Sequence, residues 1–242
     1  MVNFMFLLIL HFIGDFYFQS SKIAKCKNAT VDECCNTCNS CKKNSFFNSR
    51  YLIIHTLLYL IPFLTLFFIT KWTSAILIII ILLSSHYIID AISCCLNKKF
   101  KQTPIFIADQ FFHICILFTI NKLFSFNCTF LQYETVIKII LASLFIIVPS
   151  SIFINKLFQD LFPKDEKGRI FDVGSIIGIL ERILVLIFAC FGDFAAIAII
   201  ITVKTWARSG DLKDGNNFRN KYLLGTLASL VLALIAFLIY KM

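Results

Sequence analysis

Residues 4–18 read Phe-Met-Phe-Leu-Leu-Ile-Leu-His-Phe-Ile-Gly-Asp-Phe-Tyr-Phe, an apolar run that contains one histidine and one aspartate. An apolar run of this length, with so few polar residues, is typical of a helix that lies in a membrane. The two ionisable residues, His11 and Asp15, are four positions apart, so a helix places both on one face. The sequence therefore predicts a membrane helix with one polar face.

The whole chain has the composition of a membrane protein. Of its 242 residues, 59% are hydrophobic and 15% are charged, and the mean hydropathy is +0.83. Soluble domains average about 25% charged residues, so the composition excludes a soluble domain with a large core. The net charge of +9 is better explained by loop charges that fix membrane orientation than by binding to nucleic acid, and we expect no nucleic acid partner.

We predict an all-α polytopic bundle of about eight transmembrane helices embedded in a lipid bilayer. Seven helices span if the short segment 194–207 is re-entrant. Residues 1–130 form a four-helix core with a Cys-rich loop at 19–50, and residues 131–242 form a C-terminal transmembrane half. The predicted segments are 3–18, 51–70, 73–95, 104–121, 135–155, 173–191, 194–207 and 222–240.

Basic residues are concentrated in alternate loops of this prediction. Eighteen lysines and arginines lie in or beside the first, third, fifth and seventh loops, against three on the opposite side. Because basic loops stay on the cytoplasmic side, this bias places these four loops in the cytoplasm and both termini outside. It indicates a multi-pass protein of the cytoplasmic membrane.

The ionisable residues of the first four helices all fall near cytoplasmic ends, because successive helices run in opposite directions. A central aspartate costs ~2.5 kcal/mol or more on insertion scales, so such residues face a protein interior or a wet cavity. Imidazole and carboxylate are ligands of zinc and of manganese- or iron-like ions. We predict a divalent metal site, zinc being favoured, in which the histidines bind metal and the aspartates ligate, orient a histidine or take part in catalysis. The histidines are His11, His55, His86 and His113, and the aspartates are Asp15, Asp90 and Asp109.

Further polar residues are candidates for contact with a substrate or with the metal ligands. Two glutamines lie one turn or one residue from the aspartates. Four charged residues in the second half are expected either to form ion pairs between helices or to bind substrate. A basic cluster on the cytoplasmic side also suits a phosphate or a lipid head group. These candidates are Gln19, Gln110, Glu181, Arg182, Lys204 and Arg208.

The first cytoplasmic loop contains a run of closely spaced cysteines. Cys34, Cys35, Cys38 and Cys41 follow the pattern Cys-Cys-x-x-Cys-x-x-Cys, which suits a tetrahedral zinc ion. A cytoplasmic loop disfavours stable disulfides. The alternative is a variable surface insertion with free thiols.

The chain resembles a bacterial family of membrane proteins, the domain-of-unknown-function family 3307. In the first half the resemblance rests on His11-Phe-Ile-Gly-Asp15-Phe-Tyr-Phe-Gln19, His55 with Tyr59, Ser85-His86-Tyr-Ile-Ile-Asp90, and Ile107-Ala-Asp109-Gln110-Phe-Phe-His113. In the second half it rests on Gly178-Ile-Leu-Glu181-Arg182, Lys204-Thr-Trp-Ala-Arg208, and Tyr222-Leu-Leu-Gly225-Thr226-Leu. The resemblance implies a bacterial inner membrane protein, and the Cys-rich insertion departs from the family pattern.

Three functional hypotheses follow from the sequence. The first is an intramembrane metal-dependent hydrolase that acts on a membrane-delivered, lipid-linked substrate at the cytoplasmic leaflet. The second is a proton-coupled or ion transporter that uses the same histidines and aspartates. The third is a regulatory or scaffold membrane protein in which the cysteine loop senses zinc or redox state. Neither the substrate nor the oligomeric state follows from the sequence.

Overall fold

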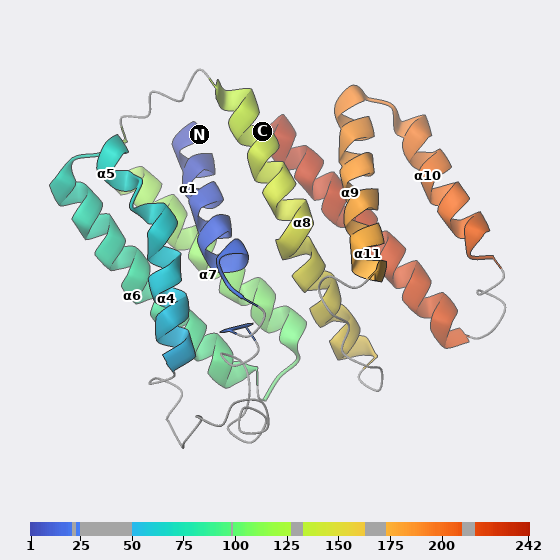
Figure 1. Ribbon diagram of the computed structural model, residues 1–242, viewed down its shortest axis with the longest axis horizontal. Coiled ribbons are helices and arrows are strands. Elements are labelled where there is room, and N and C mark those ends of the chain that lie inside the picture. Colours follow the sequence, from blue (N-terminus) through green and yellow to red (C-terminus); the bar gives the residue numbers. More distant parts are fainter. Residues whose placement is uncertain (21–22, 25–49, 98, 127–132, 163–172, 210–215) are drawn as a thin grey trace. The chain divides into compact units, whose positions relative to one another are not determined.

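The computed structural model describes residues 1–20, 23–24, 50–97, 99–126, 133–162, 173–209 and 216–242 (Figure 1). Within these ranges every regular element is a helix, as predicted, and no strand occurs. The elements, including one π-helical turn, are α1 (Val2–Phe12), η1 (Ile13–Tyr17), α4 (Arg50–Phe63), α5 (Leu66–Ile69), α6 (Trp72–Leu96), α7 (Gln102–Leu123), α8 (Glu134–Leu161), α9 (Val173–Phe191), α10 (Phe194–Ala207) and α11 (Asn216–Lys241).

Helices occupy all eight of the apolar segments predicted from the sequence. Six of the helical segments are long and apolar enough to cross a membrane, and α4 with α5 counts as one of them. The other two, α1 with η1 and α10, are shorter apolar helices. The chain is therefore a multi-pass membrane protein with six long candidate spans, while the count of eight and the sides of the two termini stay predictions.

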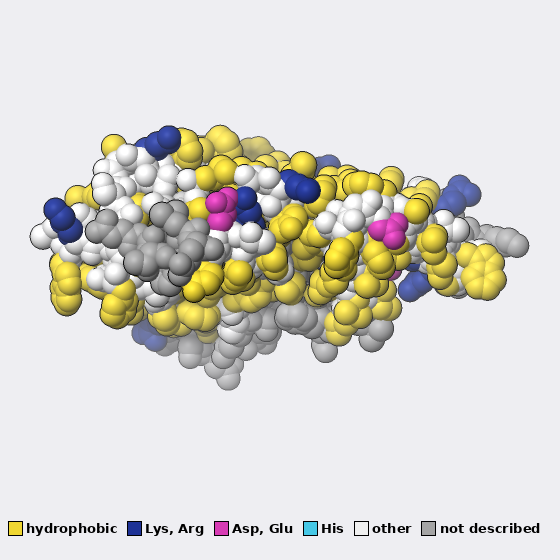
Figure 2. All heavy atoms as spheres, turned by 90° about the horizontal axis from the view of Figure 1, so that it is seen from above, with side chains coloured by type: hydrophobic (Ala, Val, Ile, Leu, Met, Phe, Trp, Pro, Cys, Tyr) yellow, Lys and Arg dark blue, Asp and Glu magenta, His cyan; other side chains and the backbone are white. Residues whose placement is uncertain are grey.

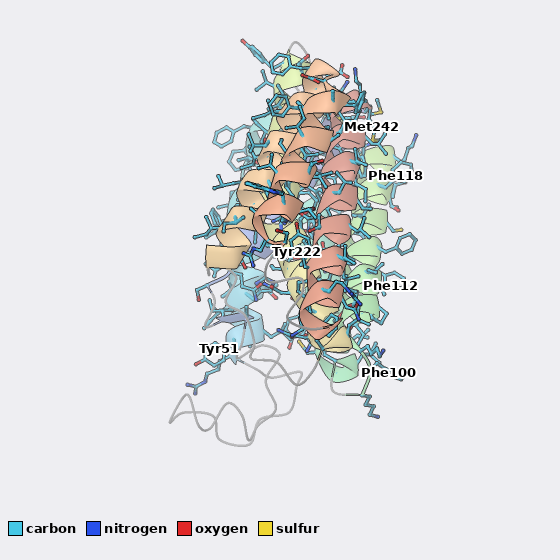
Figure 3. The ribbon with its side chains drawn as sticks, turned by 90° about the vertical axis from the view of Figure 1, so that its right-hand side faces the viewer. Tyr51, Phe100, Phe112, Phe118, Tyr222 and Met242 are labelled. Carbon is cyan, nitrogen blue, oxygen red and sulfur yellow. The ribbon has the colours of Figure 1, made fainter. Side chains whose placement is uncertain are left out.

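Large apolar side chains cover the outer faces of the helices. Figure 2 looks onto one end of the helices, where apolar side chains form much of the described surface and no histidine is visible. Figure 3 shows Phe112 and Phe118 projecting outward from α7, and both are about half exposed. Soluble proteins rarely expose contiguous apolar patches of this kind, whereas a lipid bilayer covers them.

The chain forms two compact units, Met1–Ile137 and Lys138–Met242. In the first unit, a group of buried apolar side chains comes from the beginnings of α1 and α6 and from the ends of α4 and α7. Since these helices alternate in direction, the group fills one end of the unit. Its most buried members include Leu7, Ile78 and Leu117. The other end of the unit is left for polar residues.

Gly14 allows η1 and α4 to approach closely. A Cβ at this position would lie 2.9 Å from Cδ2 of Tyr59 and 3.2 Å from Cγ of Pro62, closer than real side chains allow. Pro62 lies one residue before the end of α4. The helix ends at Phe63, and the hydroxyl of Thr65 donates to the Pro62 carbonyl at 2.7 Å. Glycine thus allows η1 and α4 to approach each other, and α4 ends at Phe63, one residue after Pro62.

In the second unit, α8 continues through Pro149 without a break. A proline within a helix leaves the carbonyl four residues earlier without its usual partner. Here the freed carbonyl belongs to Phe145, and the hydroxyl of Ser150 donates to it at 2.8 Å. In this unit α9 packs against both α10 and α11. Small residues such as Ala233 and Ala236 are fully buried in the cores that join these helices.

Candidate metal centre in the first unit

The structure brings the side chains of all seven predicted histidines and aspartates into one cluster. They come from α1, η1, α4, α6 and α7. Six of them are at most 5% exposed, and the side chain of Asp109, at 12%, is the least buried. The cluster, called here the His/Asp cluster, consists of His11, Asp15, His55, His86, Asp90, Asp109 and His113.

Four ligand-type atoms crowd together at the centre of the cluster. Nε2 of His55 lies 3.1 Å from Oδ1 of Asp15, 3.2 Å from Oδ2 of Asp90 and 3.1 Å from Nε2 of His86. Nε2 of His86 is in turn 4.0 Å from the same Asp15 oxygen and 3.6 Å from the same Asp90 oxygen. These four atoms, from three different helical segments, are called here the central four.

Hydrogen bonds alone do not explain the central four. A ring nitrogen carries at most one proton, and an ionised carboxylate carries none. His55 Nε2 therefore donates to no more than one of its three close neighbours, although all three are potential acceptors. A cation at the centre removes this conflict, because every one of the four atoms then supplies a lone pair. The crowding thus favours a metal ion over a purely hydrogen-bonded arrangement.

The separations also suit tetrahedral coordination. Metal–ligand bonds of about 2.0–2.2 Å place neighbouring ligands of a tetrahedral zinc ion about 3.3–3.6 Å apart. The five distances above, each of which involves a histidine nitrogen, lie between 3.1 and 4.0 Å and bracket this range. Imidazole nitrogen and carboxylate oxygen are ordinary zinc ligands, so donor type and spacing point to the same class of ion.

A second group of three residues shares His86 and Asp90 with the central four. His86, Asp90 and His113 offer ligand atoms within 4.8 Å of one another. Nε2 of His113 lies 3.9 Å from Oδ1 of Asp90 and 3.8 Å from Oδ2 of Asp109, beyond hydrogen-bond distance. This nitrogen is buried and has no hydrogen-bond partner among the described residues. It is therefore available to a ligand that enters the cluster.

Gln110 connects the remaining parts of the cluster. Its side-chain amide donates to Oδ2 of Asp15 at 3.0 Å and to Oδ2 of Asp109 at 3.1 Å. Its carbonyl oxygen lies 3.2 Å from Nε2 of His11. Because a carbonyl oxygen only accepts, His11 carries its proton on Nε2 and accepts at Nδ1 from the hydroxyl of Tyr59, 3.1 Å away. Gln110 thus fixes the orientation of two carboxylates and the tautomer of one histidine.

Two residues of the site were not predicted as site residues from the sequence. The Tyr59 ring stacks on His86, with centroids 3.8 Å apart and planes 8° from parallel. Ser93 donates to Oδ1 of Asp109 at 2.6 Å. Their spacing is the signal in the sequence, since Tyr59 follows His55 by four residues and Ser93 follows Asp90 by three. Each therefore shares a helix face with a predicted ligand.

The π-helical turn η1 carries Asp15. Such turns often occur at functional sites in otherwise α-helical segments. Gln19 lies beyond the end of η1 and makes no hydrogen bond among the described residues, so the structure does not bring it into the cluster. The loop cysteines Cys34, Cys35, Cys38 and Cys41 lie outside the described residues.

The charged candidates of the second half form a separate arrangement within their own unit. Glu181 and Lys204 form an ion pair between α9 and α10 at 2.5 Å, one of the pairings expected from the sequence. Three hydrogen bonds of Arg182 go to neutral acceptors within the second unit. A Cβ added at Gly178 would meet Nη1 of Arg182, on the same helix, at 3.5 Å. Gly178 also borders a pocket.

Fold and site together define a class of protein: a multi-pass helical membrane protein with a buried cluster of four histidines and three aspartates. The chain belongs to the family described as protein of unknown function (DUF3307), whose model matches residues 3–38 and 35–142. The matched ranges contain the whole His/Asp cluster, and the second-half motifs lie beyond them. No curated protein and no solved structure matches the chain.

Proposed function

We propose that the chain is an intramembrane metal-dependent hydrolase that acts on a membrane-delivered substrate. The observation that carries the proposal is the convergence of the central four atoms, two from histidines and two from aspartates. Ionisable groups in a membrane are costly and are retained where they serve a function. A divalent ion, zinc by its donor set, is the ligand that these atoms suit best.

The bound ion would supply an activated water, which is the nucleophile that hydrolysis requires. The residues around the ligands supply orientation. Gln110 holds Asp15 and Asp109 by hydrogen bonds from one amide group. Asp109 is the most accessible carboxylate of the cluster and is also held by Ser93. In this proposal Asp109 is the group that exchanges a proton with the water.

The packing of the first unit favours a hydrolase over a transporter. A transport path needs polar groups on both sides of the cluster. On one side the space is filled by apolar residues, including Phe63, Leu82 and Leu117. Leu82 lies one helical turn before His86, and Leu117 lies one turn after His113. Apolar packing therefore closes the cluster on this side, which disfavours a transport path through it.

The substrate in this proposal is lipid-linked, since the helices expose apolar faces to the bilayer. The cytoplasmic leaflet as the side of access, and the bacterial inner membrane as the location, are parts of the same proposal. They rest on the distribution of basic loop residues.

The test uses the full chain in liposomes of a bacterial polar lipid extract, with lipid mass spectrometry as the readout. Removal of metal with a chelator should stop the appearance of hydrolysed lipid, and zinc should restore it. His86→Ala should abolish the product, because His86 belongs to both metal-binding groups. Ser84→Ala is the matched control, since Ser84 is exposed on the same helix and its hydroxyl donates to the carbonyls of Ile80 and Ile81 of that helix.

Product formation that survives both the chelator and His86→Ala would refute the proposed role of the metal. Absence of any product from metal-loaded wild type would refute a hydrolase acting on these lipids. A proton or cation flux across the same liposomes that is lost in Asp90→Asn would favour the transporter instead.

A further inference from the structure

The second unit contains a pocket of about 410 Å³, lined by residues of α8, α9, α10 and α11. Four cationic side chains line it, and only one carboxylate, that of Glu181, does so among the described residues. The four cations are Arg182, Lys204, Arg208 and Lys221. A membrane-embedded pocket with this excess of positive charge suits an anion.

Arg182 carries a charge that its protein neighbours do not neutralise. The residue is 3% exposed. Its Nε donates to the carbonyl of Ile146 at 2.9 Å, and its two Nη atoms donate to Ser151 at 2.6 Å and Ser229 at 3.4 Å. All three acceptors are neutral, and no carboxylate of the described residues pairs with the guanidinium. Buried charges are normally paired, and the one carboxylate of the described residues that acts on this guanidinium, that of the adjacent Glu181, is itself in an ion pair with Lys204.

The guanidinium also has donors to spare. It offers five N–H groups, and the three hydrogen bonds leave two of them over. The pocket extends along Gly178, where an added Cβ would meet Nη1 of Arg182 at 3.5 Å and no other atom within 4 Å. The absence of a side chain at Gly178 therefore leaves the guanidinium next to open space.

The other three cations of the pocket make different contacts with the protein. Lys204 is paired with Glu181 and lies 5.6 Å above the ring of Tyr222, the α11 residue labelled in Figure 3. Arg208, at the end of α10, is exposed and has no ion pair among the described residues. Lys221 lies 5.3 Å from the Phe162 ring centroid. The carboxylate of Glu181 is thus paired with Lys204, and Arg182 and Arg208 have no ion pair among the described residues.

Apolar side chains complete the pocket. Ile154, Phe158 and Ile177 line it together with the cations. The pocket lies where α8 ends and α9 begins, and where α10 ends and α11 begins. The cations therefore lie near one membrane surface. A pocket that combines cations with an apolar wall suits an anionic head group attached to an acyl chain.

We propose that this pocket binds a phosphate group, and that the phosphate is carried by an anionic phospholipid. Arginine recognises phosphate through parallel N–H donors, which Arg182 still has available. Arg208 and Lys221 add charge at the mouth. The proposal concerns the second unit alone and does not depend on a metal in the first.

The test measures binding of fluorescent phosphatidic acid to the full chain in phosphatidylcholine nanodiscs. Wild type should bind it saturably and more tightly than labelled phosphatidylcholine. Each neutralised cation should weaken binding about fivefold, so Arg208→Gln combined with Lys221→Gln should weaken it about 25-fold. These two side chains lie at the end of the helices, and the variant keeps Arg182, which supports the helix at Pro149.

Lys241→Gln is the matched control, because Lys241 is on the same helix as Lys221 but outside the pocket. It should bind phosphatidic acid as wild type does. A second arm titrates inorganic phosphate alone. Saturable phosphate binding that weakens in the double variant, without a preference for phosphatidic acid, would support the phosphate ligand and identify a solute as its source. Equal binding by wild type and the double variant, or no saturable binding of either probe, would overturn the proposal.

Discussion

Replacement of Tyr59 by phenylalanine separates the two contacts that this residue makes in the His/Asp cluster. The hydroxyl donates to Nδ1 of His11, and the ring stacks on His86. Phenylalanine retains the ring and its burial but removes the donor. His11 keeps its bond to Gln110, so only one hydrogen bond is lost and the Nδ1 atom is left without a partner.

We expect Tyr59→Phe to lower the free energy of unfolding less than Tyr59→Ala does. Side-chain hydrogen bonds between membrane helices average about 0.6 kcal/mol and reach about 1.7. The orphaned nitrogen raises the cost toward the usual penalty of about 1–3 kcal/mol for a buried unsatisfied group. We therefore expect Tyr59→Phe to lower the free energy of unfolding by about 1–2 kcal/mol. Tyr59→Ala also removes a ring that is 1% exposed, at a cost of about 3–5 kcal/mol.

Steric trapping in bicelles measures the free energy of unfolding of membrane proteins at equilibrium. A double-mutant cycle with His11→Leu should give a coupling energy between Tyr59 and His11 of about 0.6–1.7 kcal/mol. A coupling near zero would refute the hydrogen bond. A Phe variant as destabilised as the Ala variant would refute the stack on His86, since phenylalanine preserves it.

Two further predictions concern the backbone near Pro62 in the first unit and near Pro149 in the second. Gly14→Ala should lower the free energy of unfolding by about 1–3 kcal/mol, because the new Cβ lies 2.9 Å from the Tyr59 ring. Gly178→Ala is the control: its contact is at 3.5 Å, so it should lower the free energy of unfolding less in the same assay. Equal losses would contradict the close approach of η1 and α4. Ser150→Ala should lower the free energy of unfolding by about 1 kcal/mol, since the carbonyl of Phe145 loses the Ser150 hydroxyl as its donor beside Pro149. An unchanged free energy of unfolding would mean that this carbonyl has another partner.

The sequence predicted the helices well because apolar runs are long and loops are polar. The predicted segment 173–191 and α9 have the same bounds, as do 194–207 and α10. It also predicted that the ionisable residues of four helical segments lie together, because alternating helix direction brings their ends to one level. Their burial and mutual distances required the structure.

Other parts of the site lay beyond sequence reasoning. The π-helical turn at Ile13–Tyr17 packs against α4 at Gly14, and no local propensity specifies such a turn. Tyr59 and Ser93 are neutral polar residues in apolar runs, so they carry no charge cost that would mark them as functional. The neutral surroundings of Arg182 depend on which hydroxyls three helices place around it. Spacing along one helix does not contain that information.

The central claim is that two histidines and two aspartates bind one divalent ion. The metal-to-protein ratio of purified wild type, by inductively coupled plasma mass spectrometry, tests it most directly, with His55→Ala beside Ser84→Ala. His55 is chosen because its Nε2 is the atom closest to the other three of the central four. We predict about one zinc or similar ion per chain in wild type and Ser84→Ala, and a large loss in His55→Ala. A folded wild-type protein that takes up no divalent metal, or a His55→Ala variant with an unchanged ratio, would contradict the account.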